Sequence, residues 1–170
     1  DLVIISLKDG VADCGTMKRV ALTGLAEVAP EDPEPEFVAI NSLGEIAVTL
    51  QENNEIVIVD GKTGEVKTHF SAGTVDLEGI DTKSDGALKF TGTKDGVPRE
   101  PDAVKWLDND RLVIANEGDW NGGSRGFTIF DKTTIESLSV GDLGFDELRF
   151  ATPGSPGQNN DPIIYNRVGQ

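Results

Sequence analysis

The sequence contains one cysteine and one histidine among its 170 residues. Cys14 therefore cannot form a disulfide within the chain, and we interpret it as a structural thiol. His69 lies in the alternating stretch EVKTHF, which is typical of a strand, so we expect a structural role for it as well. With a single histidine, this chain cannot by itself form a metal site that needs several histidine ligands. The sequence also lacks GxxxxGK[ST], HExxH and CxxC motifs, which would indicate familiar catalytic or metal sites.

Positive charge is also scarce. Lysine and arginine total 15 against 30 aspartates and glutamates, which gives a formal net charge of -15. This balance argues against binding to nucleic acid or to an anionic membrane surface, since both reward clustered basic residues. No apolar run approaches the roughly 18 residues that a membrane span requires. The composition instead suits a secreted or periplasmic protein, or one that holds divalent cations.

Short apolar runs separated by turn residues make up most of the chain. LVIISL (2–7) and EIVIVD (55–60) are compact enough for strands that are buried on both faces. NSLGE, DGKTG, KSDG and TKDG are turn signals. Because no stretch shows a 3.6-residue period with caps at both ends, the sequence predicts an all-β fold.

An internal repeat organises these runs. EPEFVAINSLGEIAVTLQEN (34–53) aligns without a gap with EPDAVKWLDNDRLVIANEGD (100–119), at an offset of 100 minus 34, or 66 residues. A strand ending in aspartate follows each copy (56–60 and 127–131), and a turn and a fourth strand come next. Four strands in about 40–45 residues are typical of one β-propeller blade.

The repeat predicts roughly two and a half four-stranded blades of a larger β-propeller. The two blades lie near 34–73 and 100–142, the inserted segment 74–99 is expected to form an extra hairpin, and 151–170 is a loop or linker tail. The N-terminal residues match the third and fourth strands of a preceding blade. Since a closed propeller needs four or more blades, we expect the remainder in the same polypeptide or in a companion fragment. The alternative is a self-contained β-sandwich.

Several stretches resemble a known family. PEFVAINSLGEIAVTLQENNEIVIVDGKTGEV, GIDTKSDGALKF, EPDAVKWL and RLVIANEGD are similar to the choice-of-anchor I proteins, secreted bacterial propellers grouped with alkaline-phosphatase-like and esterase-like phytase proteins. The resemblance covers about residues 30–131 and implies an extracellular or periplasmic domain of some hundreds of residues. In GIDTKSDG, the residues Asp81, Ser84 and Asp85 keep part of a calcium-loop-like pattern that family members complete with one more acidic residue.

Acidic residues recur at equivalent places of the repeat. They begin the first strand of each unit and follow its second strand, and these two places share one end of a sheet because neighbouring strands are antiparallel. Closely packed carboxylates repel one another unless protons or a cation intervene, and hard oxygen ligands without histidine favour Ca²⁺. The alternative is that they are ordinary strand-start and turn residues. The predicted Ca²⁺ ligands are Glu34, Glu36, Glu52, Glu100, Asp102, Glu117 and Asp119.

Two tryptophans and one arginine complete the candidates. Trp106 is expected in the core or between blades, and we favour packing over ligand stacking for Trp120. Arg125 lies in the glycine-rich stretch 121–126 and is a candidate anion-binding residue, or else a solvated loop arginine.

Three functions fit these observations. The first is a secreted, acidic, calcium-binding propeller that acts as a surface-associated binding module. The second is a calcium-dependent phosphoesterase of the alkaline-phosphatase-like or phytase-like type, in which clustered Ca²⁺ would bind phosphate oxygens and polarise a water molecule. Lys105, Arg99 and Arg125 are the basic residues available to it. The third is a purely structural component of a surface layer.

Overall fold

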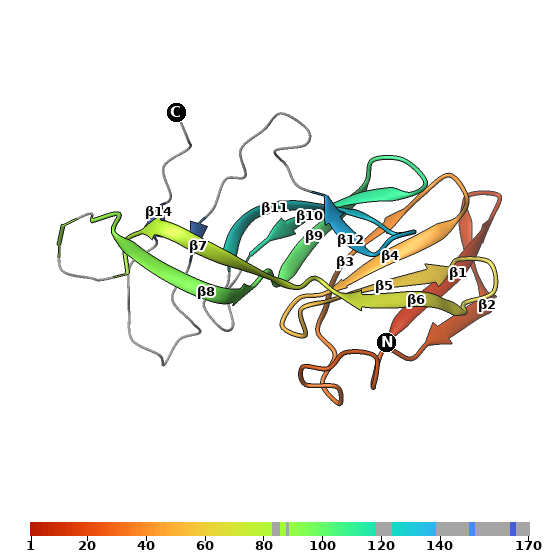
Figure 1. Ribbon diagram of the computed structural model, residues 1–170. Coiled ribbons are helices and arrows are strands. Elements are labelled where there is room, and N and C mark those ends of the chain that lie inside the picture. The colour runs from red at the N-terminus through yellow and green to blue at the C-terminus, as the bar shows by residue number, and fades with distance from the viewer. Residues whose placement is uncertain (83–85, 88, 118–123, 139–149, 152–163, 166–170) are drawn as a thin grey trace.

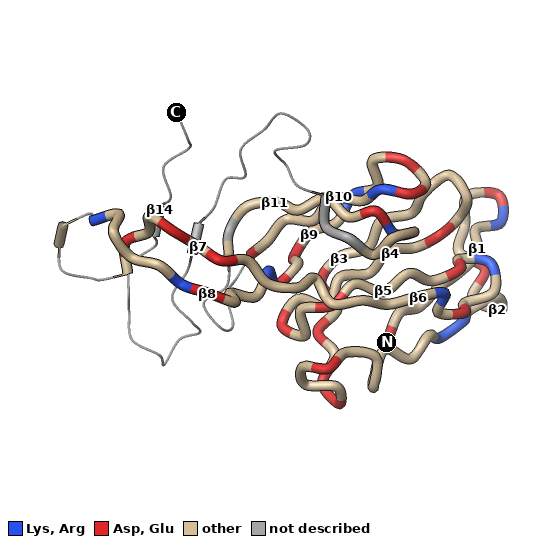
Figure 2. Tube along the Cα trace, in the orientation of Figure 1, with Lys and Arg blue, Asp and Glu red and all other residues tan. Residues whose placement is uncertain are grey.

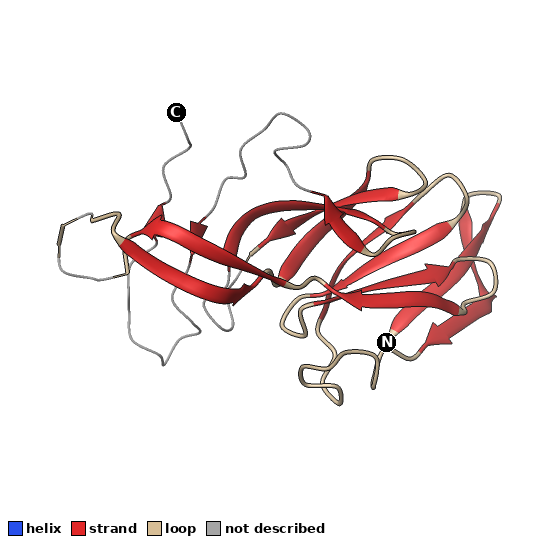
Figure 3. Cartoon of the chain, in the orientation of Figure 1, coloured by secondary structure: helices blue, strands red, loops and turns tan. Residues whose placement is uncertain are grey.

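The computed structural model describes residues 1–82, 86–87, 89–117, 124–138, 150–151 and 164–165. Every regular element in these residues is a β-strand, and all pairs of strands are antiparallel (Figures 1 and 3). The predicted all-β fold class is therefore confirmed. The strands are β1 (Leu2–Lys8), β2 (Val11–Val20), β3 (Pro35–Ile40), β4 (Glu45–Leu50), β5 (Glu55–Asp60), β6 (Val66–Ser71), β7 (Thr74–Ile80), β8 (Gly92–Pro98), β9 (Pro101–Trp106), β10 (Arg111–Asn116), β11 (Ser124–Asp131), β12 (Glu136–Leu138), β13 (Phe150–Ala151) and β14 (Ile164–Tyr165).

Most strands within a sheet pair with the strand next to them in sequence. β1 and β2 form the N-terminal hairpin, and β7 and β8 form the inserted hairpin. β3, β4, β5 and β6 pair in that order, and we call this sheet the first meander. β9, β10, β11 and β12 likewise pair in sequence order, and we call this sheet the second meander. β13 and β14 extend it from β11. Neither meander contains a crossover connection.

The two meanders repeat one another at the spacing seen in the sequence. β9 starts 101 minus 35, or 66, residues after β3, and β10 starts 111 minus 45, again 66, residues after β4. Backbone hydrogen bonds repeat too. The N–H of Gln51 donates to the carbonyl of Glu34 at 3.0 Å, and the N–H of Glu117 donates to that of Glu100 at 3.0 Å. The alignment of the two sequence stretches thus corresponds to two copies of one structural unit.

The two meanders pack face to face through an apolar cluster. β3 lies beside β9, and the indole N–H of Trp106 in β9 donates to the carbonyl of Ala39 in β3 at 3.0 Å. Burying each large apolar side chain in such a cluster contributes roughly 1.5–3 kcal/mol, so this cluster is the main contact between the sheets. Trp106 therefore packs between the two repeats, as predicted. The cluster contains Ala47, Ile56, Ile58, Phe70 and Ala72 from the first repeat and Val104, Trp106, Leu112, Ile114 and Phe130 from the second.

A buried carboxylate joins the two meanders at the edge of this cluster. Glu45, at the start of β4, is 5% exposed and accepts hydrogen bonds from the ammonium groups of Lys67 and Lys132. Lys67 belongs to the first meander, but Lys132 follows β11 in the second, and its ammonium group also lies 5.5 Å from the centre of the Trp106 ring. Asn41 donates to the same carboxylate at 2.7 Å. Glu45 is therefore a charged contact between two sheets that are otherwise held by apolar packing.

The opposite face of the first meander is partly covered by the N-terminal hairpin. Leu2 and Ile4 of β1 pack with Val20 and Leu22 against buried aliphatic side chains of β4 and β5. The meander thus has apolar neighbours on both of its faces. On the first-meander side, the buried members of this second cluster are Ile46, Val48, Leu50, Val57 and Val59.

The inserted hairpin projects from the stacked sheets (Figure 1). It carries its own small apolar cluster of Val75, Leu77, Ile80 and Val97. The hairpin expected within 74–99 is therefore present. The backbone N–H of Arg99 donates to the carbonyl of Gly73 at 3.2 Å, so the two ends of the insertion are joined where it leaves the stack.

The described sheets do not close into a ring or barrel, and the propeller therefore stays a prediction. Most of the predicted tail 151–170 lies outside the described residues. Within it, residue 151 and residues 164–165 belong to short strands paired with each other and, through β13, with β11.

The Glu45 contact predicts a specific acid sensitivity. Burial alone would raise the pKa of Glu45, but hydrogen bonds from Lys132, Lys67 and Asn41 outweigh it and lower the pKa from 4.5 to about 2. A carboxyl with a lowered pKa in the folded state stabilises the protein above its unfolded pKa, and this stability is lost as the pH falls toward the folded value. The contribution is at most about 3 kcal/mol. We expect the difference in unfolding free energy between the native chain and Glu45→Gln to shrink between pH 4.5 and pH 2. Urea unfolding at a series of pH values measures this, and a pH-independent difference would contradict it.

Candidate functional site

The predicted Ca²⁺ ligands occupy different environments. Glu34 and Glu36, at the start of β3, are exposed, whereas Glu100, just before β9, is 1% exposed. The side chains of Glu52, Asp102 and Glu117 are half-buried. Asp119 lies outside the described residues. Figure 2 likewise shows acidic residues spread over both meanders and both hairpins.

The start of the first strand and the end of the second do meet in both repeats, through the repeated backbone hydrogen bonds described above. The carboxylates at these places are nevertheless not assembled into a recognisable site. Among the residues that the structure describes, no group of three or more His, Cys, Asp and Glu side chains is arranged to hold a metal ion. Because Asp119 is not described, the Ca²⁺ assignment stays a prediction.

Glu100 has a structural function that the sequence did not suggest. Its backbone lies in the left-handed region, with φ of 47°, which non-glycine residues adopt uncommonly. Its N–H donates to the side-chain oxygen of Asn54 at 2.9 Å, and the amide of Asn54 donates to the carbonyl of Gly73 at 2.9 Å. Asn54 lies between β4 and β5. It therefore joins the start of β9 to Gly73, which follows β6.

The neighbouring Asn53 fastens another loop. It is 2% exposed, and its amide donates to the carbonyls of Val28, Ala29 and Asp32, while its oxygen accepts the N–H of Glu34 at 2.8 Å. The adjacent asparagines of the QENN stretch thus fix the connections on both sides of the first meander. Both asparagines are buried and satisfy several backbone groups, so their role is structural.

His69 pairs with a buried carboxylate, which agrees with the structural role expected for it. It lies in β6, and its Nδ1 is 2.8 Å from a carboxylate oxygen of Glu55 in β5. Burial raises the pKa of Glu55, and the hydrogen bond and charge of His69 only partly oppose this. The pair therefore satisfies a carboxylate that would otherwise be buried alone.

The other candidate residues contribute less to a site. Asp81 is buried and accepts the backbone N–H of Lys89 at 3.1 Å, while Ser84 and Asp85 lie outside the described residues. Arg125 is part of β11, but its side chain is not among those described, and Trp120 is not described at all. The structure therefore does not test the anion-binding prediction.

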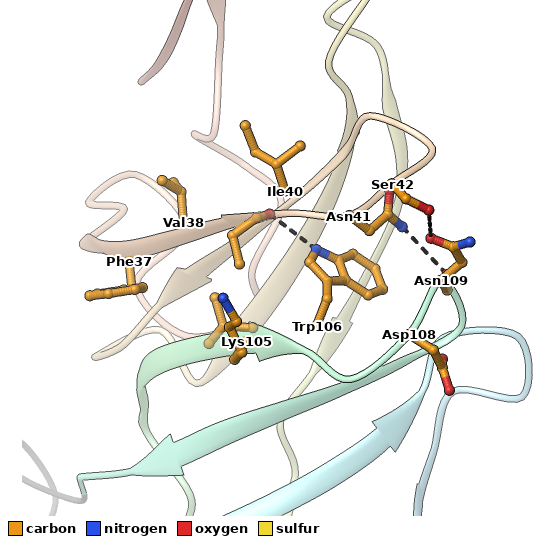
Figure 4. A pocket seen from close by; sticks show the side chains of 11 residues that line it. Phe37, Val38, Ile40, Asn41, Ser42, Lys105, Trp106, Asp108 and Asn109 are labelled. Atoms are coloured by element: carbon orange, nitrogen blue, oxygen red, sulfur yellow. Dashed lines mark hydrogen bonds between the residues drawn. The ribbon is translucent and has the colours of Figure 1, made fainter.

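A groove between β3 and β9 was not apparent from the sequence. It has a volume of about 540 Å³, and its lining includes Phe37 and Lys105 together with the polar turn residues Asn41, Ser42 and Asn109. Figure 4 shows Trp106 between the two strands, and Ser42 donating from the first repeat to Asn109 of the second at 2.7 Å. The 49% exposed ring of Phe37 gives the groove an apolar wall. The groove therefore combines apolar and polar groups, both of which binding sites use.

Asp108 lies at the end of this groove and accepts hydrogen bonds from its own turn. Backbone N–H groups of Asp110 and Arg111 and the guanidinium of Arg111 donate to it and lower its pKa to about 2. These bonds build the turn between β9 and β10, so Asp108 shapes the rim of the groove.

The chain also matches a protein-family model. The family model of the Choice-of-anchor I domain matches residues 15–151. The chain belongs to the choice-of-anchor I domain family. The match spans the part of the N-terminal hairpin from residue 15, both meanders and the inserted hairpin, and it confirms this part of the resemblance. Among curated proteins, none matches the chain.

Membership of a choice-of-anchor family indicates a cell-surface or secreted protein. The described residues include no helix with the length and apolar character needed to cross a bilayer. The match does not test the grouping with alkaline-phosphatase-like and phytase-like proteins, which stays a prediction.

The contacts of Asn54 predict a cost for its removal. Asn54→Gly permits the left-handed backbone (φ of 53°) but removes the acceptor for Glu100 N–H and the donor to Gly73. Leaving buried backbone groups unpaired costs about 1–3 kcal/mol. We expect a lower urea midpoint for this variant, while Asn109→Gly, which loses a bond to an exposed serine, serves as the control. Equal midpoints for both variants would contradict the role given to Asn54.

Proposed function

We propose that this chain is part of a β-propeller that serves as a binding module at the cell surface. The observation that carries the proposal is the face-to-face packing of two four-stranded meanders that repeat after 66 residues. Propeller blades are four-stranded sheets stacked around an axis, with successive strands as neighbours. A β-sandwich, by contrast, usually contains the crossing connections of a Greek key, and the meanders have none. The remainder of the propeller is the expected partner of this chain.

The groove between β3 and β9 supports the binding part of the proposal. Both are edge strands of their sheets and the first strands of their repeats. In a propeller, the first strands line the central channel, so a groove between two of them is open to a ligand that enters there. The exposed ring of Phe37 and the ammonium group of Lys105 are the groups available for contact.

Calcium binding by the repeated carboxylates belongs to the same proposal. Among the predicted ligands that the structure describes, Glu34 and Glu36 are the exposed ones. If they bind Ca²⁺ in the folded state, excess Ca²⁺ stabilises that state by mass action.

We therefore expect the melting temperature of the purified chain to rise with excess Ca²⁺ over its value with a chelator. The double variant Glu34→Gln/Glu36→Gln should lose much of this rise. Glu78→Gln/Asp95→Asn removes the same charge from the inserted hairpin and should keep it. Differential scanning fluorimetry measures all three, and an unchanged melting temperature for the native chain would end the Ca²⁺ assignment.

The alternative phosphoesterase has no observation in its favour among the described residues and stays a prediction. We expect the purified chain to hydrolyse p-nitrophenyl phosphate no faster than a blank, both with excess Ca²⁺ and with a chelator. Release of p-nitrophenolate followed by absorbance measures this. Turnover that a chelator stops, and that co-purifies with the chain, would replace the binding module by a metal-dependent hydrolase.

A further inference from the structure

The first meander has an apolar strip that the N-terminal hairpin leaves uncovered. Val38 and Ile40 in β3 are 49% and 66% exposed. They pair with Val48 and Ile46 of β4, so all four side chains lie on the same face of the sheet. Figure 4 shows Val38 and Ile40 on the side of β3 away from Lys105 and Trp106. The hairpin therefore buries only the β4–β5 half of this face.

The second meander shows what covers the same positions when a neighbouring sheet is complete. The residues 66 places after Val38 and Ile40 are Val104 and Trp106, which are only 3% and 8% exposed. They are buried because the first meander, with β3 beside β9, packs over them. The equivalent neighbour for Val38 and Ile40 would be a strand of the sheet that contains β1, on the side of β1 away from β2.

β1 offers an edge for such an addition. Among the described residues, its sheet contains β1 and β2 and no third strand. β1 corresponds in the repeat to β5, which has partners on both edges. An unpaired edge strand is a template for another strand. A hollow of about 230 Å³ separates the start of β1 from β3, with Asp1, Leu2 and Val3 on one side and Phe37 and Val38 on the other.

We propose that the β1 edge and the Val38–Ile40 strip together receive a two-stranded antiparallel β-segment. One of its strands pairs with β1 as β4 pairs with β5, and the other covers Val38 and Ile40 as β3 covers Val104 and Trp106. The inference rests on the proposed function, because it takes the N-terminal hairpin as the outer half of a blade.

The repeat also specifies the chemistry of this segment. Ala39 is the small residue of β3 whose carbonyl accepts from the large Trp106. In the proposed contact, Ile40 takes the place of Trp106, and a residue of the partner segment takes the place of Ala39. Because isoleucine is smaller than tryptophan, that partner residue must be larger than alanine to fill the same space. The partner strand is thus apolar toward β3 and bulkier than β3 itself.

A peptide from this chain can serve as the probe. Residues 34–50 form β3 and β4, and β4 pairs with β5 as one strand of the partner segment would pair with β1. The test uses this peptide with Ala39→Leu and a fluorescent label, titrated with the purified full chain by fluorescence anisotropy. We expect saturable binding that the chain variant Val38→Lys/Ile40→Lys weakens by about tenfold or more. Val11→Lys is the matched control, since Val11 lies on β2, away from the β1 edge, and is 69% exposed, and it should bind within about twofold of the native chain.

Hydrogen exchange then locates the peptide. We expect the backbone amides of β1 to exchange more slowly when the peptide is bound. Binding that leaves β1 unprotected would mean that the peptide replaces β3 and β4 in their own sheet, and would overturn the proposal. So would the absence of saturable binding, or equal binding to Val38→Lys/Ile40→Lys.

Two further measurements keep the result interpretable. Circular dichroism checks that the double variant is folded, and the single variant Ile40→Lys, at the more exposed of the two sites, replaces it if it is not. Sedimentation velocity tests for self-association, and a dimer that Ile40→Lys disperses would assign the strip to a second copy and overturn the proposal. Failure of the peptide to bind would overturn only this inference, whereas the binding-module proposal is replaced only if the phosphate-ester assay shows turnover that a chelator stops.

Discussion

The structure depends on one constraint: the first meander has two apolar faces, and both are covered by neighbouring sheets. In the first meander, Ala47, Ile56 and Ile58 point to the second meander, while Val48 and Val57 point to the N-terminal hairpin. A sheet of this kind cannot satisfy its own apolar surface, so it is stable only between two neighbours. The layered arrangement of hairpin, first meander and second meander follows from this need.

Polar contacts decide how the layers meet. Apolar packing is largely non-directional, whereas the Glu45–Lys132 contact and the Trp106 N–H bond to Ala39 each require one relative position of the two sheets. The Glu45 contact is not repeated, because residue 111, the equivalent of Glu45, is an arginine that pairs with Asp108 in its own turn. The repeat thus supplies the layers, and unique side chains fix their alignment.

The strands could be predicted because their signal is periodic and local. The gapless alignment placed β3, β4, β9 and β10, and the two strands ending in aspartate placed β5 and β11. The turn after each of these strands uses the same aspartate bond, to the N–H groups of Lys62 and Thr63 in one and of Thr133 in the other.

The details of the site could not be predicted, because they depend on which distant residues meet. Glu100 carries the same sequence signs as the exposed Glu34, and only the fold shows that it is buried and that its N–H binds Asn54. Lys132 is 87 positions from Glu45, and no pattern relates the two residues. The groove beside Phe37 likewise exists only because β3 and β9 come together from separate repeats.

The two ends of the inserted hairpin lie side by side, and this affects how the insertion can vary within the family. The hydrogen bond from Arg99 to Gly73 brings the two ends of the insertion together at the surface of the stack. A segment that leaves and returns at one point changes the rest of the chain only through its loop-closure entropy, which grows with the logarithm of its length. Each doubling of the insertion would cost about 0.6 kcal/mol. Evolution is therefore free to lengthen, shorten or redecorate this hairpin without disturbing the contact between the sheets on either side of it.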